Sequence, residues 1–300
     1  MAALLAGGAG IAFAPIFVRW SEVPSTATAF WRLALAAPLM LAWAARTPRE
    51  RAPVRGDGWR LAMPGLFFAA DLGFWHWSIH LTTAANATLL ANFAPVFVAL
   101  GGWILFRRSF GGRFVSGMLL AIAGAGLLVA RSVEVSPRHA AGDLLGLVTA
   151  VFYGSYILAV GRLRERLSTA RILAWTVTVG AAALLPVSLA AGETLFPSTA
   201  RGWAVLAALA LVSQVGGQGL SAYALAHLPA ALSSVTLLLQ PVMVVGVGWV
   251  LLGEAMGPLQ GLGAAVILAG ILRCRSAYGG GRLSSSSSAA SGVPGPGSEA

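Results

Sequence analysis

The stretch TLLANFAPVFVALGGW, residues 88 to 103, places a polar Asn92 and a helix-breaking Pro95 inside an apolar run that is long enough to cross a membrane. A proline removes one backbone hydrogen bond from a helix, and in lipid the freed carbonyl must be satisfied by protein or by cavity water. A second stretch, SVTLLLQPVMVVGVGW at residues 234 to 249, repeats the spacing of proline, glycine and tryptophan. The same helix interruption is therefore predicted twice in the chain.

The composition predicts an integral membrane protein. Hydrophobic residues make up 57% of the chain and charged residues only 10%, whereas soluble domains carry about 25% charged residues. The apolar runs reach the roughly 20 residues that a helix needs to cross the hydrocarbon core, and they lack the alternation of a membrane β-barrel. We expect an all-α membrane protein with ten transmembrane helices. The predicted spans are residues 2–18, 26–45, 60–80, 84–106, 113–130, 141–160, 171–190, 202–225, 230–252 and 257–273.

The arginines predict the orientation of these helices. All 20 basic residues are arginines, and they lie in short clusters between apolar runs. With both termini in the cytoplasm, the inside segments hold 15 of them and the outside segments 4, and Arg32 lies within a span. The positive-inside rule favours this orientation. The net charge of +10 is thus explained by topology, and we expect membrane lipid but no nucleic acid among the partners.

The chain also aligns with itself at an offset of 146 residues, the separation of Pro95 and Pro241. Several small or bulky residues keep this register without gaps: Gly102 with Gly248, Trp103 with Trp249, Gly117 with Gly263, and Gly124 with Gly270. We predict two five-helix repeats, residues 1–131 and 141–273. The remaining tail, residues 276–300, is rich in Ser, Gly and Pro and is expected to be disordered.

An odd number of spans in each repeat means that the two copies have opposite orientations in the membrane. The charges agree, because the turn after the fourth span carries Arg107 and Arg108, whereas the equivalent turn carries Gly253 and Glu254. Inverted repeats are typical of secondary transporters, which bind substrate near the midplane between the repeats.

Three runs of residues resemble the EamA family of the drug/metabolite transporter superfamily: FWRLALAAPL (30–39), LTTAANATLLANFAPVFVAL (81–100) and LPAALSSVTLLLQPVMVVGVGWVLLGEAMGPLQGLGAAVILAGI (228–271). The resemblance implies a ten-helix secondary transporter of small organic metabolites such as amino acids, with export expected and alternating access between the repeats. It implies a central cavity lined chiefly by helices 1–4 and 6–9. We expect a multi-pass protein of a bacterial-type plasma (inner) membrane, working as a monomer or a homodimer.

Asp71 and Arg32 are the candidate charged site residues. An acid about nine residues from either end of a span is costly unless it is paired or faces water. By the rise of a helix, Arg32 and Asp71 lie roughly 10 and 13 Å deep from the same side. Asp71 could bind a proton or a substrate amine, and Arg32 could set its pKa or hold a carboxylate. The alternatives are a structural ion pair, or an Arg32 that snorkels to the interface.

Polar residues on other spans complete the predicted substrate site. Trp75 shares the helical face of Asp71, and Gln214 and Gln218 share one face of a glycine-rich helix, where they could bind substrate or hold helices together. Asn92 and Gln240 flank the two prolines but are not equivalent by the repeat, so we expect asymmetric contacts to an asymmetric substrate.

His76 and His80 leave a metal-ion carrier open as an alternative, because their i, i+4 spacing places two potential ligands on one helical face. No third ligand is evident, so no resident metal or other cofactor is expected. An intramembrane enzyme is a weaker alternative: Ser155 directly follows Gly154 and lacks a nucleophile motif. The chain is therefore not expected to be an enzyme. Pro95 and Pro241 are predicted as the shared kinks of the two repeats.

Overall fold

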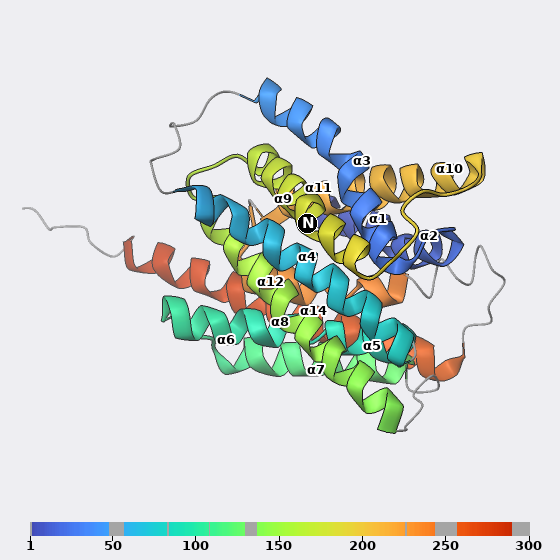
Figure 1. The fold of residues 1–300 in the computed structure, drawn as a ribbon. Coiled ribbons are helices and arrows are strands. Elements are labelled where there is room, and N and C mark those ends of the chain that lie inside the picture. The colour runs from blue at the N-terminus through green and yellow to red at the C-terminus, as the bar shows by residue number, and fades with distance from the viewer. Residues whose placement is uncertain are drawn as a thin grey trace, which may run out of the picture.

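The computed structural model describes residues 2–47, 57–82, 84–107, 109–129, 137–225, 227–243 and 257–289, and in these ranges the secondary structure is helical, with no strand (Figure 1). The N-terminal helices are α1 (Ala2–Ala12), α2 (Ala14–Trp20), α3 (Ser25–Arg46), α4 (Asp57–Leu81), α5 (Ala84–Ala91), α6 (Ala94–Phe106) and α7 (Gly112–Val129). The C-terminal ones are α8 (Pro137–Leu163), α9 (Thr169–Ala190), α10 (Ala200–Ala208), the π-helix η2 (Leu209–Gln218), α11 (Gly219–Leu225), α12 (Ala230–Leu237) and α14 (Pro258–Ala289).

Seven helical stretches of the described residues are long and apolar enough to cross a membrane. They are Ala2–Trp20, Ser25–Arg46, Leu89–Phe106, His139–Leu163, Thr169–Ala190, Ala200–Ala224 and Pro258–Ala277. Two shorter apolar helices, Gly112–Leu127 and Ala231–Met243, accompany them. Together with the composition, these helices make the chain a multi-pass membrane protein.

Both proline-containing stretches are interrupted helices. α5 ends at Ala91 and α6 begins at Ala94, with Pro95 in the first turn of α6, where its missing N–H costs no helical hydrogen bond. α12 ends at Leu237, four residues before Pro241. The ends of α5 and α12 are 146 residues apart, and so are their beginnings. A third interruption, at Phe13, precedes Pro15 and separates α1 from α2.

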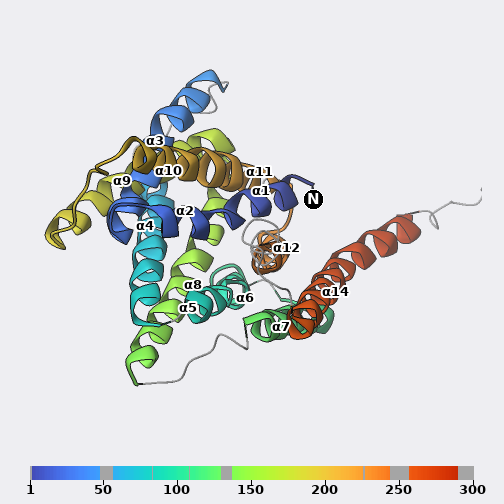
Figure 2. The ribbon, with the colours of Figure 1, turned by 90° about the vertical axis from the view of Figure 1, so that its right-hand side faces the viewer.

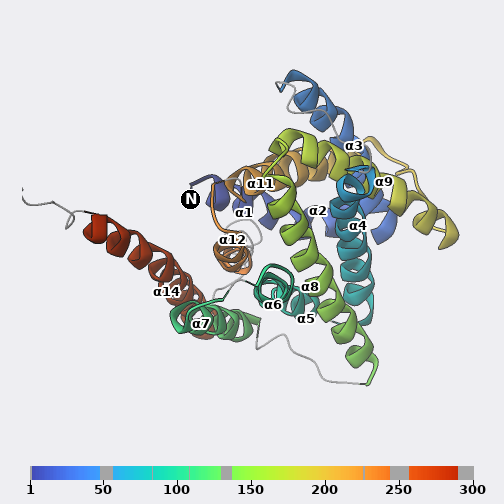
Figure 3. The same ribbon diagram turned by 90° about the vertical axis from the view of Figure 1, so that its left-hand side faces the viewer.

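The helices pack in a few long antiparallel or crossing pairs. α4 lies along α8 and α9, α3 along α9, and α1 along η2 and α11. Figure 2 shows α7 and α14 side by side at one edge of the molecule, and Figure 3 shows α12 and α6 between this pair and α8 from the opposite side. α12 and the α5–α6 segment therefore occupy the middle of the bundle.

α7 and α14 approach each other through glycines. A Cβ atom at Gly117 would lie 2.8 Å from the carbonyl oxygen of Gly270, and one at Gly124 would lie 2.8 Å from that of Gly263. Backbones this close leave no space for a side chain, which is how small residues bring membrane helices together.

The C-terminal end of the last helix differs from the prediction. The span was expected to end at residue 273 and to be followed by a disordered tail from residue 276, but α14 continues through Ala289. No proline interrupts the backbone hydrogen bonds between Pro258 and Pro294, although Gly279, Gly280 and Gly281 each disfavour a helix by about 1 kcal/mol relative to alanine. Residues 290–300 lie outside the described residues.

Candidate functional site

A cavity of about 130 Å³ lies where the helix interruptions meet. It is lined from the α1–α2 junction, α3, α4, the end of α5, α8, η2 and the segment that follows α12. We call it the central cavity. Its lining residues are Ile11, Ala12, Ala14, Pro15, Arg32, Phe68, Asp71, Leu72, Trp75, Ala91, Asn92, Thr149, Tyr153, Gln218, Gln240 and Pro241.

The central cavity collects most of the site residues expected from the sequence. Six of the seven predicted substrate-binding side chains line it: Arg32, Asp71, Trp75, Asn92, Gln218 and Gln240. The seventh, Gln214, lies behind Arg32. Of the two predicted kinks, Pro241 lines the cavity, whereas Pro95 is buried outside its lining. Residues that are far apart in sequence thus line one space, in which these polar side chains stand in a mainly apolar wall.

Arg32 is held in the cavity wall by contacts from two other helices. Its Nε donates a hydrogen bond to Oε1 of Gln214, over 2.9 Å, and its guanidinium carbon lies 5.9 Å from the centre of the Phe68 ring. The side chain is only 4% exposed, so Arg32 does not extend to the membrane interface. The η2 helix, through Gln214, therefore positions the cation.

Asp71 supplies the opposite charge in the same cavity. It projects from α4 and is 8% exposed, and it attracts Arg32 electrostatically. Arg32 and Asp71 both line the central cavity, so they lie near each other, as their similar depths in the membrane predict. A cation and a carboxylate that line a common space, whose wall also carries side-chain amides, can bind the two charged ends of a zwitterion.

Two further polar groups in the cavity wall have unused hydrogen-bonding capacity. Oγ1 of Thr149 and Nε2 of Gln240 are buried and, among the described residues, have no hydrogen-bond partner. The Tyr153 hydroxyl lies beside the amides of Gln218 and Gln240. Because an unsatisfied buried polar group costs about 1–3 kcal/mol, such groups indicate a place for water or a polar ligand.

The sequence reasoning did not assign Thr149 to the site. Thr149 and Tyr153 are four residues apart in α8, and Tyr156 lies 6.1 Å from Tyr153 between ring centres. A threonine and two tyrosines recurring at helical spacing on an apolar span was the signal that could have identified this face.

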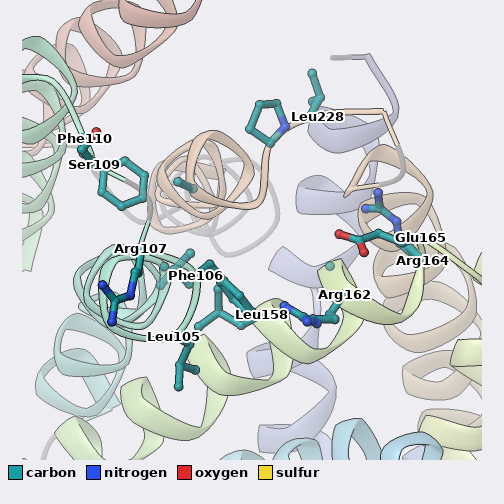
Figure 4. A pocket seen from close by; sticks show the side chains of 15 residues that line it. Leu105, Phe106, Arg107, Ser109, Phe110, Leu158, Arg162, Arg164, Glu165 and Leu228 are labelled. Carbon is teal, nitrogen blue, oxygen red and sulfur yellow. The ribbon is translucent and has the colours of Figure 1, made fainter.

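A second, larger hollow lies beside the ends of α6 and α8 and the start of α12, with a volume of about 1060 Å³ (Figure 4). We call it the vestibule. It contains four charged residues, Arg107, Arg162, Arg164 and Glu165, and an otherwise largely apolar wall. The other lining residues are Val98, Gly102, Leu105, Phe106, Ser109, Phe110, Leu158, Gly161, Leu228, Pro229 and Ala231.

His76, one of the two histidines considered as metal ligands, lies outside both linings. His76 is 1% exposed and its ring lies 5.2 Å from that of Trp75, whereas the side chain of His80 is outside the described residues. Among the side chains that the structure describes, no three His, Cys, Asp or Glu residues group as metal ligands would.

Comparison with known proteins gives relatives along most of the chain. An uncharacterized transporter of Archaeoglobus fulgidus is 27% identical over 253 residues, which cover 81% of this chain and 85% of that protein. The pseudopaline exporter CntI of Pseudomonas aeruginosa is 28% identical over 212 residues, or 69% of this chain and 72% of CntI. A protein named "Probable terminal-alkyne amino-acid exporter" from Streptantibioticus cattleyicolor is 27% identical over 197 residues, 66% of each chain.

A crystal structure with 20% sequence identity superimposes on this fold with a TM-score of 0.75, over 92% of this chain and 98% of that one. At this identity the likeness concerns the fold alone. The family model of the EamA-like transporter family matches residues 1–130 and 140–273. These matches cover most of the sequence, and the chain therefore belongs to the EamA-like transporter family.

Proposed function

We propose that this protein is a secondary transporter that exports small amino-acid-like metabolites by alternating access. The observation that carries the proposal is the central cavity, which Arg32 and Asp71 line together with Asn92, Gln218 and Gln240. The names of two relatives, one an exporter of pseudopaline and one an exporter of a terminal-alkyne amino acid, support the direction and the substrate class.

In this proposal the two charges divide the substrate between them. Arg32, oriented by Gln214, binds the carboxylate of the substrate. Asp71 binds the amine of the substrate or, when no substrate is bound, a proton. The amide of Gln240 and the hydroxyl of Thr149 donate to the remaining polar atoms of the substrate. Trp75 and Phe68 pack against the apolar part of the substrate.

Inverted repeats are one common basis of alternating access, and several observations support two repeats in this chain. The family model matches the chain twice, once in each half. The bounds of α5 and α12 keep the 146-residue offset. Pro95 follows α5 and Pro241 follows α12, and the two prolines would then act as equivalent hinges of a ten-helix transporter.

The glycine contacts between α7 and α14 support an opposite orientation of the two copies. At the same offset, Gly117 is equivalent to Gly263, and Gly124 to Gly270. Replacing each residue of the Gly117–Gly270 contact by its equivalent in the other repeat gives the contact between Gly263 and Gly124. Both contacts are present in the structure. Such self-mapping contacts are typical of two-fold symmetry. The order of the contacts is antiparallel, as an axis in the membrane plane requires.

The membrane orientation follows from the arginines. We place both termini in the cytoplasm of a cell with a bacterial-type plasma membrane, because the arginine-rich turns then lie inside. The vestibule, at the ends of α6 and α8, opens on this side. An exporter would receive its substrate there and release it on the other side.

Metabolite profiles of the medium test this proposal. Cells that express the protein should accumulate amino-acid-like compounds outside, relative to cells that do not. Asp71→Asn should reduce this accumulation at least tenfold. A matched control is Asp143→Asn, which lies outside both cavity linings and keeps the oxygen that accepts from Thr82 Oγ1, at 2.8 Å. An unchanged medium, or equal export by Asp71→Asn and the wild type, would overturn the proposal.

A further inference from the structure

The vestibule has a charge that topology alone does not explain. The arginine-rich ends of helices commonly face bulk water, but here three arginines, Arg107, Arg162 and Arg164, line one hollow together with a single carboxylate, Glu165. Figure 4 shows Arg107 on one side of the hollow, Arg164 and Glu165 across it, and Arg162 between them. The hollow is therefore a positively charged space that concentrates anions.

These guanidinium groups have hydrogen-bonding capacity to spare. In the part of the chain that the structure describes, none of the three donates a hydrogen bond or forms an ion pair. Arg162 stacks on the Phe106 ring, 4.9 Å from its centre, which fixes the cation without using its donors. The Nε of Arg164 is buried and has no partner among the described residues. Burial accordingly lowers the pKa of the Arg164 guanidinium, a cost that a bound anion would offset.

Arg107 occupies a backbone conformation that suits glycine better. It caps α6 with φ 48° and ψ 31°, in the left-handed region, and its N–H donates to the carbonyl of Gly102. Helices commonly end with glycine in this conformation, because a Cβ atom is unfavourable there. An arginine at this position indicates that its side chain serves a purpose other than ending the helix.

We propose that the vestibule is a carboxylate-binding site that loads anionic substrates into the central cavity. This inference rests on the proposed function and narrows its substrate class to amino-acid derivatives with a net negative charge. The volume of about 1060 Å³ accommodates a whole metabolite of this kind. Val98 and Gly102 of α6 line the vestibule, and Asn92, just before α6, lines the central cavity, so a substrate would follow one segment from the first site to the second.

Citrate is the probe for this site, and thermal unfolding of the purified full-length protein is the measurement. We define the citrate shift as the Tm in citrate minus the Tm in chloride at equal ionic strength. The citrate shift of the wild type should exceed that of the double variant Arg162→Gln/Arg164→Gln by roughly 2–4 °C. The comparison with a variant is necessary because citrate also stabilises proteins by exclusion from their surface. Arg113→Gln, an exposed arginine outside the vestibule, should keep the wild-type shift.

Two further variants separate binding from folding effects. Arg107→Gly should raise the Tm in chloride, because glycine removes the strain at φ 48°, and should lower the citrate shift. Arg162→Lys/Arg164→Lys retains the charge and should retain most of the shift. Equal citrate shifts in the wild type and in Arg162→Gln/Arg164→Gln would overturn the proposal.

Lipid headgroups carry a similar charge, so the measurement is repeated in nanodiscs. If phosphatidylglycerol removes the citrate shift and uncharged lipid preserves it, the occupant is lipid, and the loading role is overturned. Persistence of the shift in both supports a soluble anion. The assay needs no export: a failed citrate test with intact export would refute only this inference, whereas citrate binding without export would refute the proposed function.

Discussion

Replacing Gly124 with alanine should weaken the protein, whereas the same change two residues later should strengthen it. Both glycines lie in α7. A Cβ atom at Gly124 would lie 2.7 Å from the backbone nitrogen of Ile267 and 2.8 Å from the carbonyl oxygen of Gly263 in α14, whereas one at Gly126 meets nothing within 4 Å. The two substitutions share their chemistry and their helix, so they differ mainly in the approach of α14.

The magnitude follows from two opposing effects. Alanine stabilises a helix interior by about 1 kcal/mol relative to glycine. Forcing a methyl group into a filled contact costs about 1–3 kcal/mol. We therefore expect Gly126→Ala to raise the free energy of unfolding by up to about 1 kcal/mol, and Gly124→Ala to lower it by about 0–2 kcal/mol.

Reversible unfolding in mixed detergent–SDS micelles measures this difference. The symmetry adds a second pair: Gly270→Ala, whose Cβ would lie 2.5 Å from the nitrogen of Ala121, should behave like Gly124→Ala. Its control, Gly261→Ala, meets nothing within 4 Å. If Gly124→Ala and Gly126→Ala are equally stabilising, α7 and α14 are not in backbone contact, and the argument for two-fold related repeats fails.

Two other substitutions test the positioning of Arg32 by Gln214 and the contact of Glu22 with Ser198 and Thr199. Gln214→Leu leaves the buried Arg32 Nε without its acceptor. This should lower the free energy of unfolding by about 1–3 kcal/mol and should reduce metabolite release from cells. An unchanged free energy of unfolding and unchanged release would exclude the positioning role. Hydrogen bonds from Thr199 and Ser198 lower the pKa of Glu22 below 4.5, so its stabilisation is present above pH 4.5 and is lost as the pH falls through the lowered value. The Tm difference between the wild type and Glu22→Gln should therefore shrink on acidification, and a constant difference would contradict this.

Local sequence rules indicated two of the three helix interruptions, those near Pro95 and Pro241, but not the one at Phe13, where a single span over residues 2–18 was expected. Proline has no N–H and tends to occupy the first turn of a helix, so the break before Pro95 follows from one residue. The segment after residue 273 was different, because serine, glycine and alanine are compatible with both disorder and a helical continuation. α14 continues to Ala289 in a region where composition had indicated disorder.

The site was only partly within reach of sequence reasoning. The cost of a charge inside an apolar span selected Asp71, similar depth selected Arg32, and helical spacing selected Gln218; all three line the central cavity. Their partners depend on tertiary packing: the acceptor for Arg32 lies 182 residues away, in η2. The vestibule was not predicted, because its arginines had already been explained by the positive-inside rule.

Counterflow in proteoliposomes tests the central claim most directly. Vesicles are loaded with an excess of an unlabelled amino-acid derivative found in the medium of expressing cells, and the labelled compound is added outside without ATP. We predict transient accumulation of label in vesicles with the wild-type protein, and accumulation at the level of empty vesicles with Asp71→Asn. Label that enters wild-type vesicles no faster than protein-free vesicles would contradict the assignment of this chain as a metabolite transporter.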